Sequence, residues 1–306
     1  MNPLVTVVVP NYNYGRFLRA AIDSVLAQTF TDREVLVVDD GSTDDSLHVL
    51  RSYGNRIRWI VQPNSGQSAS RNRGIAESRG RFIALLDADD VWLPEKLARQ
   101  MALFEHRPDV GIVYCGFWAA DVSLEPFDSV LPIYRGEVLE RFAMEAGAVV
   151  RGGESTAVIR KKCFDEVGGF DPELSIGAGW DLYRRVCCRY QIDAIGEPLA
   201  LYRIHGTNAS RAADVYAHDV QLRLKKMFSD PNAARVHGYR RRSYAKSYLA
   251  IGGTYFHAKR PWPAFLYAMR SLCVWPPSIR FMLRLPNRGV RRSSEHELSP
   301  SAGEPR

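Results

Sequence analysis

Four short apolar runs recur at a regular interval near the N-terminus, and this spacing constrains the fold more than any other feature. The runs cover residues 5–10, 35–39, 57–61 and 82–87, and their starts lie 30, 22 and 25 residues apart. That interval is typical of β-α-β units. Because fully apolar strands need cover on both faces, the sequence predicts an α/β fold with an open, mostly parallel, Rossmann-like sheet and flanking helices.

After residue 110 this rhythm weakens. Residues 111–116 and 155–160 are predicted strands, whereas residues 214–227 and 239–275 are predicted to be mostly helical, with breaks at the prolines. Ser, Glu and Pro dominate from Arg291 onward, so we expect disorder over 291–306. The sequence therefore predicts an α/β body over 1–210, a helical extension over 211–290 and a disordered tail.

Charge divides the chain at the same place. Residues 1–210 carry 23 Lys and Arg against 28 Asp and Glu, and residues 211–306 carry 18 against 6. A basic segment of this kind fits an anionic surface, either a nucleic acid or a membrane leaflet. Arginines interrupt the apolar residues of 261–285, which disfavours a spanning helix. Two alternatives follow: an interfacial segment on a membrane, or helices packed against the α/β body.

Composition excludes several classes of protein. The 306 residues are 46% hydrophobic and 25% charged, unlike a wholly disordered chain or a polytopic membrane protein. The five cysteines show no metal-ligand spacing, and their odd number disfavours a disulfide framework. The N-terminus has no basic region before its apolar run, so we expect no signal peptide and a cytoplasmic protein.

Polar residues follow the predicted strands, where ligands bind in open α/β sheets. They are Asn11, Tyr12, Asn13, Asp39, Asp40, Asn64, Asp87, Asp89 and Asp90. Asp87 and Asp89 have the spacing to share a divalent cation that bridges a diphosphate, or they cap the next helix. Asp39 and Asp40 either contact a nucleoside or form a tight turn, and Arg71 either binds a base or phosphate or is a solvated surface residue.

Seven motifs then occur in order along the chain: PNYNYGRFL, VDDGSTDDS, NSGQSASRNRG, LLDADDVW, GGFDPEL, GWDLYRR and YRIHGTNAS. Over residues 4–210 this order resembles glycosyltransferase family 2, a family of inverting, metal-dependent enzymes with the GT-A fold. The resemblance implies a catalytic domain over 1–210, with a nucleotide-binding half (1–110) and an acceptor-binding half (111–210). It also implies a nucleoside-diphosphate sugar donor, most commonly a UDP-sugar, and Mn²⁺ or Mg²⁺ as cofactor. The implied acceptor is a glycan or a lipid-linked glycan, in surface polysaccharide or glycoconjugate synthesis.

The resemblance also implies residue roles. The donor would lie on Pro10, Tyr12, Asp39, Asp40, Asn64, Arg71, Asp87 and Asp89. Tyr12 would stack on the base, with Arg71 beside it. Asp89 would bind the metal, with Asp87 and His205 as further contacts.

Catalysis and acceptor binding would fall to the later motifs. Asp181 would be the general base, with Asp171 as its nearest rival. The family usually places a Glu-Asp pair at the base, and here Trp180 stands in the place of the glutamate. Its indole would stack on an acceptor sugar, and Asp90 would also contact the acceptor.

Two other interpretations stay open. The LLDADDV motif also resembles the nucleophile motif of haloacid-dehalogenase-type phosphatases, in which Asp87 would be phosphorylated and Asp89 would act as acid/base. In that family the motif follows the first strand, and here it follows the fourth. A nucleotide- or nucleic-acid-binding protein without catalysis would leave the strand-end carboxylates unexplained, so we expect no nucleic-acid partner.

Overall fold

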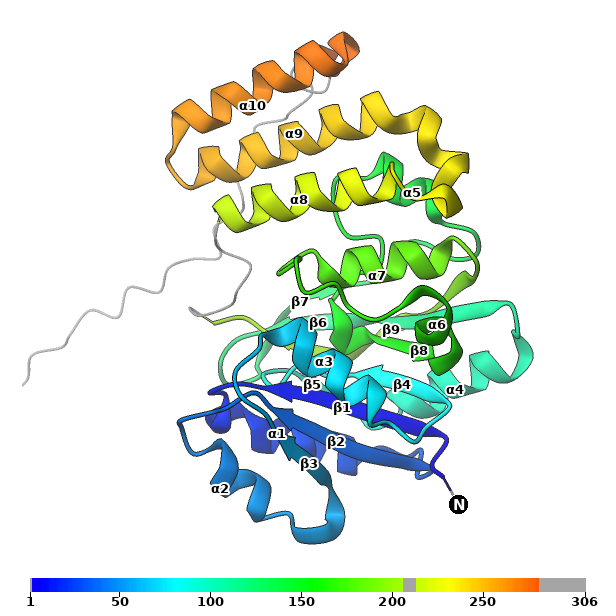
Figure 1. Ribbon diagram of the computed structural model, residues 1–306. Coiled ribbons are helices and arrows are strands. Elements are labelled where there is room, and N and C mark those ends of the chain that lie inside the picture. Colours follow the sequence, from blue (N-terminus) through cyan, green and yellow to red (C-terminus); the bar gives the residue numbers. More distant parts are fainter. Residues whose placement is uncertain (1, 206–212, 281–306) are drawn as a thin grey trace, which may run out of the picture.

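The computed structural model describes residues 2–205 and 213–280. Their strands form one nine-stranded sheet in the order β3-β2-β1-β4-β8-β6-β9-β5, with β7 paired to β6. Helices cover both faces of the sheet, and three further helices are stacked beyond one of these layers (Figure 1). The α/β class predicted from the apolar runs is confirmed.

One half of the sheet is parallel and is built from the four predicted runs. Its strands are β1 (Val5–Asn11), β2 (Arg33–Asp39), β3 (Arg58–Val61) and β4 (Phe82–Leu85). The connections contain α1 (Gly15–Leu26), α2 (Ser46–Arg51), the 3₁₀ turn η1 (Gly54–Arg56) and α3 (Gln67–Ala76). The β1–β2 register sets Asn11 beside Asp39, so the polar ends of these strands meet at one edge.

The other half of the sheet is mixed, with both parallel and antiparallel neighbours. It contains β5 (Val91–Trp92), β6 (Val110–Ala120), β7 (Pro126–Val130), β8 (Ala157–Arg160) and β9 (Gln191–Arg203). β8 lies antiparallel between β4 and β6, and β9 is parallel to β6. β6 and β8 fall on the predicted strands 111–116 and 155–160. β9 was not predicted because Gly196, Glu197 and Pro198 interrupt its apolar pattern.

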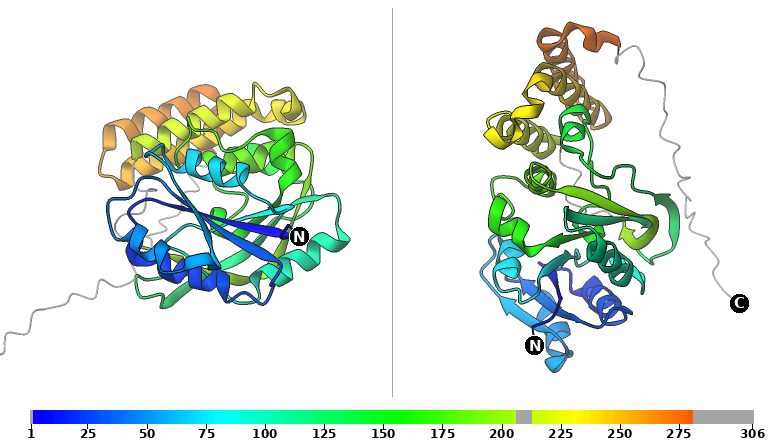
Figure 2. Two further views of the ribbon diagram at one scale, coloured as in Figure 1. Left: turned by 60° about the horizontal axis from the view of Figure 1, so that its bottom comes forward. Right: turned by 90° about the vertical axis from the view of Figure 1, so that its right-hand side faces the viewer.

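Alternating side chains of the strands feed two cores. On β1, Val5, Val7 and Val9 pack with α1, α2 and α4 (Lys96–His106), whereas Val8 faces the opposite core. That second core lies under α3, α5 (Leu139–Met144), α6 (Lys161–Val167) and α7 (Ala178–Cys187). Figure 2 shows the sheet between these two layers.

The chain after the sheet is helical, as predicted. It contains α8 (Ala213–Met227), the 3₁₀ segment η4 (Pro231–Tyr239), α9 (Arg240–His257), α10 (Pro261–Val274) and η5 (Pro276–Ser278). Val220, Leu224 and Ile251 of α8 and α9 belong to the same core as α7, whereas α10 buries only Ser271. In the described part of the chain, the helices are too short or too polar to cross a membrane. The predicted disordered tail, residues 291–306, lies outside the described residues.

Candidate active site

Asp39 is buried at the end of β2 and joins two loops. Its carboxylate accepts hydrogen bonds from Asn11 Nδ2 (2.7 Å), from Ser42 Oγ (2.7 Å) and from the Ser42 N–H (2.9 Å). Asn13, whose φ is 57°, accepts a hydrogen bond from the Thr43 N–H at 2.7 Å. The loops that follow β1 and β2 are therefore fixed to each other.

Asp40 has the same kind of environment one residue later. It is buried and accepts hydrogen bonds from Gln62 Nε2 (2.7 Å) and from the N–H groups of Ser65 (3.0 Å) and Gly66 (2.8 Å). Gly66 has φ 88°, a conformation that favours glycine, and it directly precedes α3. Two roles were predicted for Asp39 and Asp40, a contact with a nucleoside or the formation of a tight turn. Their hydrogen bonds are those of a tight turn.

Pro10, Tyr12 and Asn64 lie at the same edge of the sheet. Pro10 is buried in β1, the Tyr12 side chain is 46% exposed, and Asn64 is exposed in the loop before α3. An exposed aromatic ring beside the ends of parallel strands offers a face on which a base can stack.

The acidic turn after β4 is held by Ser155. The Asp87 N–H donates to Ser155 Oγ (3.1 Å), and Ser155 Oγ donates to Asp90 Oδ2 (2.5 Å). Asp90 Oδ1 accepts a hydrogen bond from the Arg203 N–H at 3.0 Å. Burial, and then the charges of Asp89 and Asp87, hold the pKa of Asp90 well above its ordinary value. Because Asp90 is buried and bonded within the protein, its placement argues against the predicted contact with an acceptor.

Asp89 and His205 meet although they are far apart in the sequence. His205 Nε2 lies 2.9 Å from Asp89 Oδ2, and the buried imidazole packs against the Phe17 ring at 5.2 Å. Burial, and then the charge of Asp87, raise the pKa of Asp89, whereas the hydrogen bond with His205 lowers it. Two residues predicted at a metal site are thus in contact.

Arg71 of α3 bridges the acidic turn to Glu154, in the 3₁₀ turn η2 (Glu154–Thr156). Arg71 Nη2 donates to Asp87 Oδ1 at 2.7 Å and to Glu154 Oε2 at 3.2 Å. Burial alone would lower the pKa of Arg71, but the charges of Glu154 and Asp87 raise it. Burial also raises the pKa of Glu154, which Arg71 lowers and Asp87 raises. Arg71 is therefore buried between Asp87 and Glu154 and is not a solvated surface residue.

Asp181 lies on α7 with both carboxylate oxygens paired. Oδ1 accepts from Arg184 Nη2 at 3.0 Å, and Oδ2 accepts from Arg185 Nε at 2.7 Å. Arg184 also pairs with Asp230, which follows α8. The Asp181 side chain is only 3% exposed. Both arginine partners of Asp181 lie on α7 itself, and Arg184 links this group to Asp230. Because both carboxylate oxygens are buried in ion pairs, this environment argues against the predicted role as base.

Trp180 is buried beside Asp181. Its ring meets the edge of Phe142 at 5.2 Å, and the Arg223 guanidinium covers it at 4.5 Å. This packing argues against the predicted stacking on an acceptor sugar. Asp171, the rival base, pairs instead with Lys226.

The residues at the turn fit a divalent cation shared with a substrate. Mg²⁺ and Mn²⁺ are typically held by one or two carboxylates together with phosphate oxygens and water. Asp87 and Asp89 supply the two carboxylates. Burial, and then the charge of Asp87, raise the pKa of Asp89, and a bound cation would favour its charged form. Within residues 2–205 and 213–280, His, Cys, Asp and Glu form no group of three that could hold a metal without a substrate.

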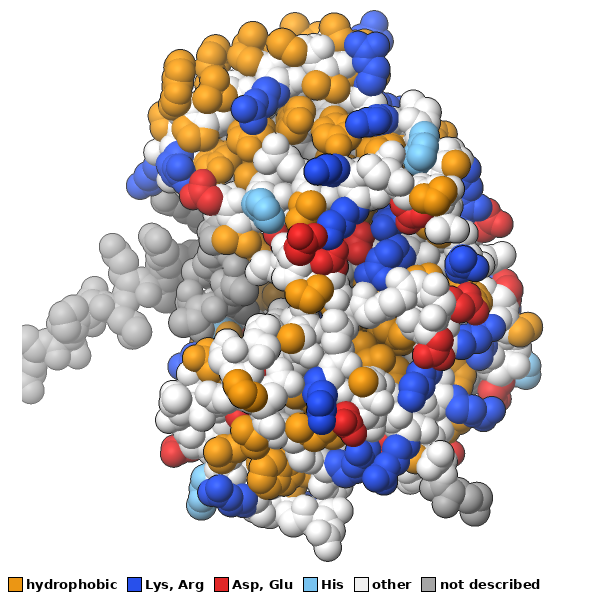
Figure 3. All heavy atoms as spheres, viewed as in Figure 1, with side chains coloured by type: hydrophobic (Ala, Val, Ile, Leu, Met, Phe, Trp, Pro, Cys, Tyr) orange, Lys and Arg blue, Asp and Glu red, His pale blue; other side chains and the backbone are white. Residues whose placement is uncertain are grey.

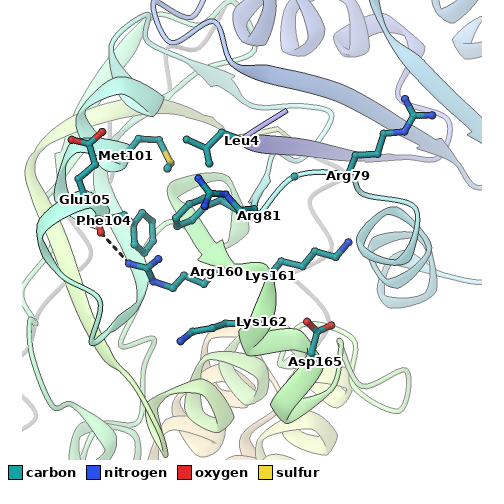
Figure 4. Close-up of a pocket in the computed structure, with 12 residues that line it drawn as sticks. Leu4, Arg79, Arg81, Met101, Phe104, Glu105, Arg160, Lys161, Lys162 and Asp165 are labelled. Atoms are coloured by element: carbon teal, nitrogen blue, oxygen red, sulfur yellow. Dashed lines mark hydrogen bonds between the residues drawn. The ribbon is translucent and has the colours of Figure 1, made fainter. Parts of the chain in front are cut away.

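A pocket of about 640 Å³ lies at the opposite edge of the sheet (Figure 4). It is lined by the basic residues Arg79, Arg81, Arg160, Lys161 and Lys162. Arg160 donates to the carbonyl groups of Phe104 and Arg107 (both 3.0 Å) at the end of α4, and Lys161 donates to that of Ser78 (2.7 Å) after α3. Arg160 and Lys161 thus bind carbonyl groups at helix ends. Because the pocket lies at the other edge of the sheet, it is separate from the carboxylate site.

Glu154 and Ser155 were not among the residues predicted from the sequence. They precede β8, which runs antiparallel to β4. The beginning of an antiparallel strand lies at the same edge as the ends of its parallel neighbours, so its preceding residues join the site. The available signal is a polar pair between two glycines and an apolar run, in GGESTAVI.

Comparison with known proteins agrees with this geometry. The family model described as Glycosyl transferase family 2 matches residues 6–168. An uncharacterized glycosyltransferase of Nostoc sp. is 33% identical over 221 residues, which are 68% of this chain and 67% of that protein.

Solved structures extend the likeness to nearly the whole fold. S. aureus TarS 1-349 in complex with UDP-GlcNAc is 16% identical, with a TM-score of 0.62 over 92% of both chains. A mannosyltransferase from Pyrobaculum calidifontis in complex with GDP-Man and Mn²⁺ is also 16% identical, with a TM-score of 0.58 over 94% of this chain and 82% of the other. Because both structures are only 16% identical to this chain, they show a shared GT-A fold and nothing more.

The family match and the Nostoc relative decide between the two enzyme classes that the LLDADDV motif left open. The chain belongs to glycosyltransferase family 2 and is a glycosyltransferase.

Proposed function

We propose that this glycosyltransferase moves a sugar from a nucleoside-diphosphate sugar, most commonly a UDP-sugar, to a hydroxyl group of a glycan or lipid-linked glycan. The observation that carries the proposal is the paired acidic turn, in which Asp87 contacts Arg71 and Asp89 contacts His205. Support comes from TarS and the mannosyltransferase, which share the fold and hold UDP-GlcNAc and GDP-Man. The product would enter a surface polysaccharide or glycoconjugate.

In this proposal the donor lies along the strand-end edge. Tyr12 stacks on the base, and Asn64 and the loop before α3 border the nucleoside. Asp39 and Asp40 act through their hydrogen bonds to the loops that carry these residues. Asp87 and Asp89 would hold Mn²⁺ or Mg²⁺ against the diphosphate, with Arg71 and His205 orienting the two carboxylates.

The reaction follows from what these residues can do. A bound cation would offset the charge that develops on the leaving nucleoside diphosphate. A carboxylate of the protein takes the proton from the acceptor hydroxyl, and the hydroxyl oxygen attacks the anomeric carbon from the face opposite the diphosphate. One displacement inverts the configuration, so no enzyme nucleophile is required.

The test is calorimetric binding of UDP, GDP and dTDP, each with and without Mn²⁺, to the wild type and to Asp89→Ala. Metal-dependent binding of one nucleotide that is lost in the variant is the expected result. Asp128→Ala, an exposed residue of β7, is the matched control and should bind like the wild type. Absence of binding for all three nucleotides would contradict the proposal.

We also propose that α10 rests on an anionic membrane surface, which would place a lipid-linked acceptor within reach. Trp262 and Phe265 are 68% and 54% exposed, and Leu266 and Met269 are exposed on the same helix. Exposed basic residues lie nearby at Lys259, Arg260, Arg270 and Arg280. Figure 3 shows apolar side chains with basic ones among them at this end of the molecule. Aromatic and basic side chains together favour an interface with anionic lipid.

Sedimentation with vesicles tests this placement. The protein should bind vesicles that contain phosphatidylglycerol more strongly than vesicles of phosphatidylcholine alone. Trp262→Ser with Phe265→Ser should weaken this binding, whereas Phe127→Ser, an exposed aromatic residue of β7, should not. Equal binding to both kinds of vesicle, or none, would contradict it. An association on the cytoplasmic face is the expectation that goes with it.

A further inference from the structure

We propose that Glu154, and not Asp181, is the general base that deprotonates the acceptor hydroxyl. This inference rests on the proposed transfer reaction and names the residue that completes it. A base must present a carboxylate oxygen to the acceptor beside the diphosphate site. Asp181 is 3% exposed with both oxygens in ion pairs, whereas the Glu154 side chain is 12% exposed and shares Arg71 with Asp87.

Two contacts position Glu154 beside the donor site. Arg71 Nη2 binds Glu154 Oε2 and Asp87 Oδ1 at once, so one guanidinium nitrogen separates the two carboxylates. The next residue, Ser155, binds the Asp87 N–H and the Asp90 carboxylate. Glu154 is therefore held at the acidic turn by its own side chain and by the side chain of the residue that follows it.

Gly179 makes room for the Glu154 carboxylate at the start of α7. A Cβ built on Gly179 would lie 1.9 Å from Glu154 Oε1 and 3.0 Å from its Cδ. The carboxylate thus occupies the space that a side chain at position 179 would take. An acidic side chain at position 179 would begin where the Glu154 carboxylate now lies. We therefore expect that either position can supply the carboxylate that acts as base.

Tyr183, one turn further along α7, indicates that a ligand binds here. Its hydroxyl is buried and has no hydrogen-bond partner among the residues that the structure describes. A Cβ built on Gly179 would also lie 3.7 Å from Tyr183 Cε2, so Tyr183 borders the space that the Glu154 carboxylate occupies. Burial, and then the charge of Glu154, hold the pKa of Tyr183 well above its ordinary value. Buried hydroxyl groups are rarely left without a partner, and a sugar hydroxyl would supply one.

A hollow of about 360 Å³ lies beside the segment that leads to Glu154. Its lining includes Phe117, Arg151 and Gly152, and Gly152 lies two residues before Glu154. Phe117 also packs against Tyr202, with the two ring centres 5.6 Å apart. In this proposal the acceptor approaches Glu154 from this hollow.

The proposed step balances without a further reactant. The acceptor O–H proton passes to the Glu154 carboxylate as the oxygen forms its bond to the anomeric carbon. The bond from that carbon to the diphosphate oxygen breaks, and the nucleoside diphosphate leaves with the electron pair. The alternative is a structural Glu154 that only neutralises Arg71.

Two kinds of assay on Glu154→Gln separate these roles. Calorimetry with the nucleotide and Mn²⁺ reports donor binding. Nucleotide release from a panel of UDP-Glc, UDP-Gal, UDP-GlcNAc and GDP-Man reports turnover, with either water or azide as acceptor. Azide needs no deprotonation, so a variant that lacks only its base reacts with azide as fast as the wild type.

We expect Glu154→Gln to bind nucleotide normally, to lose about 100-fold in turnover with water, and to recover with azide. Glu173→Gln, an exposed carboxylate in the loop before α7, is the control and should behave like the wild type. The double variant Glu154→Gly with Gly179→Asp returns a carboxylate to the vacated space, and we expect it to regain about tenfold over Glu154→Gln.

Unchanged turnover in Glu154→Gln, or a loss that azide does not restore, would overturn the assignment. If Asp181→Asn lost turnover with water and regained it with azide, while Glu154→Gln kept its turnover, Asp181 would be the base. A wild type that binds no nucleotide would contradict the proposed function instead, so the two failures are distinguishable.

Discussion

Two sets of carboxylates share one edge of the sheet and differ in what surrounds them. Asp39 and Asp40, at the end of β2, accept hydrogen bonds from side chains and backbone N–H groups of the adjoining loops. Asp87, Asp89 and Glu154 crowd around the end of β4, where burial and mutual repulsion raise the pKa of Asp89 and of Glu154. We call these the loop-holding set and the acidic cluster.

A position at this edge of the sheet therefore does not decide whether a carboxylate stabilises the fold or binds a ligand. A carboxylate whose lone pairs are used by the protein stabilises the structure, and its removal leaves buried donors unpaired. Carboxylates that repel one another cost stability, and binding of a cation or a substrate offsets that cost. Asp181, with two arginine partners, belongs with the first kind although the family resemblance assigned it to catalysis.

The largest loss of stability is expected for Asp181→Ala. It leaves Arg184 and Arg185 without this partner, and Arg184 is 2% exposed. Breaking a buried ion pair from one side should lower the free energy of unfolding by about 4 kcal/mol. Chemical denaturation measures it, with Asp165→Ala on α6 as the control. A decrease in the free energy of unfolding of less than about 1 kcal/mol would show that Asp181 does not stabilise the structure in this way.

Asp40→Ala should come next, because three donors lose one acceptor. We expect the free energy of unfolding to fall by about 3 kcal/mol, since the Ser65 and Gly66 N–H groups lose a charged partner. Denaturation in urea checks this value. Retained stability together with lost nucleotide binding would instead move Asp40 to the ligand-binding residues.

Asp89→Asn should show the opposite pattern. Removing one charge of the acidic cluster should cost about 100-fold in metal-dependent turnover, equivalent to about 2.7 kcal/mol. Without metal its thermal midpoint should not fall, because burial and Asp87 already oppose the charge on Asp89. Nucleotide release and a thermal melt, both with and without Mn²⁺, measure the two effects. A lower thermal midpoint in the absence of metal would show that Asp89 stabilises the fold as the loop-holding set does.

Lys96 extends the comparison to a buried cation, with the smallest expected effect. Its Nζ contacts Gln100 Oε1 at 2.8 Å and lies 3.8 Å from the centre of the Trp92 ring. Burial lowers the pKa of Lys96 from 10.5 to about 8, so the unfolded chain binds more protons between these values. The free energy of unfolding should therefore rise with pH across that window.

Lys96→Met should remove this rise and stabilise the protein by about 2 kcal/mol at pH 7. Urea denaturation at pH 7 and at pH 10 measures both effects. Lys162→Met, on an exposed lysine of α6, is the control. A destabilised Lys96→Met at pH 7 would show that the contacts of the ammonium group outweigh its burial.

The sequence by itself determined the parallel half of the sheet and the edge on which the site lies. The spacing of apolar runs predicts β1 to β4, and residues that follow such strands reach the same edge because parallel strands end together. Asp87 and Asp89 could therefore be predicted as neighbours of Asp39 and Asp40. These are local signals, so they need no knowledge of distant contacts.

Only the tertiary structure decided which carboxylates complete the site. Glu154 reaches Asp87 because β8 pairs with β4 in the antiparallel direction, and His205 reaches Asp89 because β9 lies beside β6 and β5. Strand pairing joins residues far apart in the chain, and a short sequence pattern carries no record of its partner. Asp181 is different, because its partners Arg184 and Arg185 lie only three and four residues further along α7, but it is the tertiary structure that buries this group and pairs Arg184 with Asp230 as well.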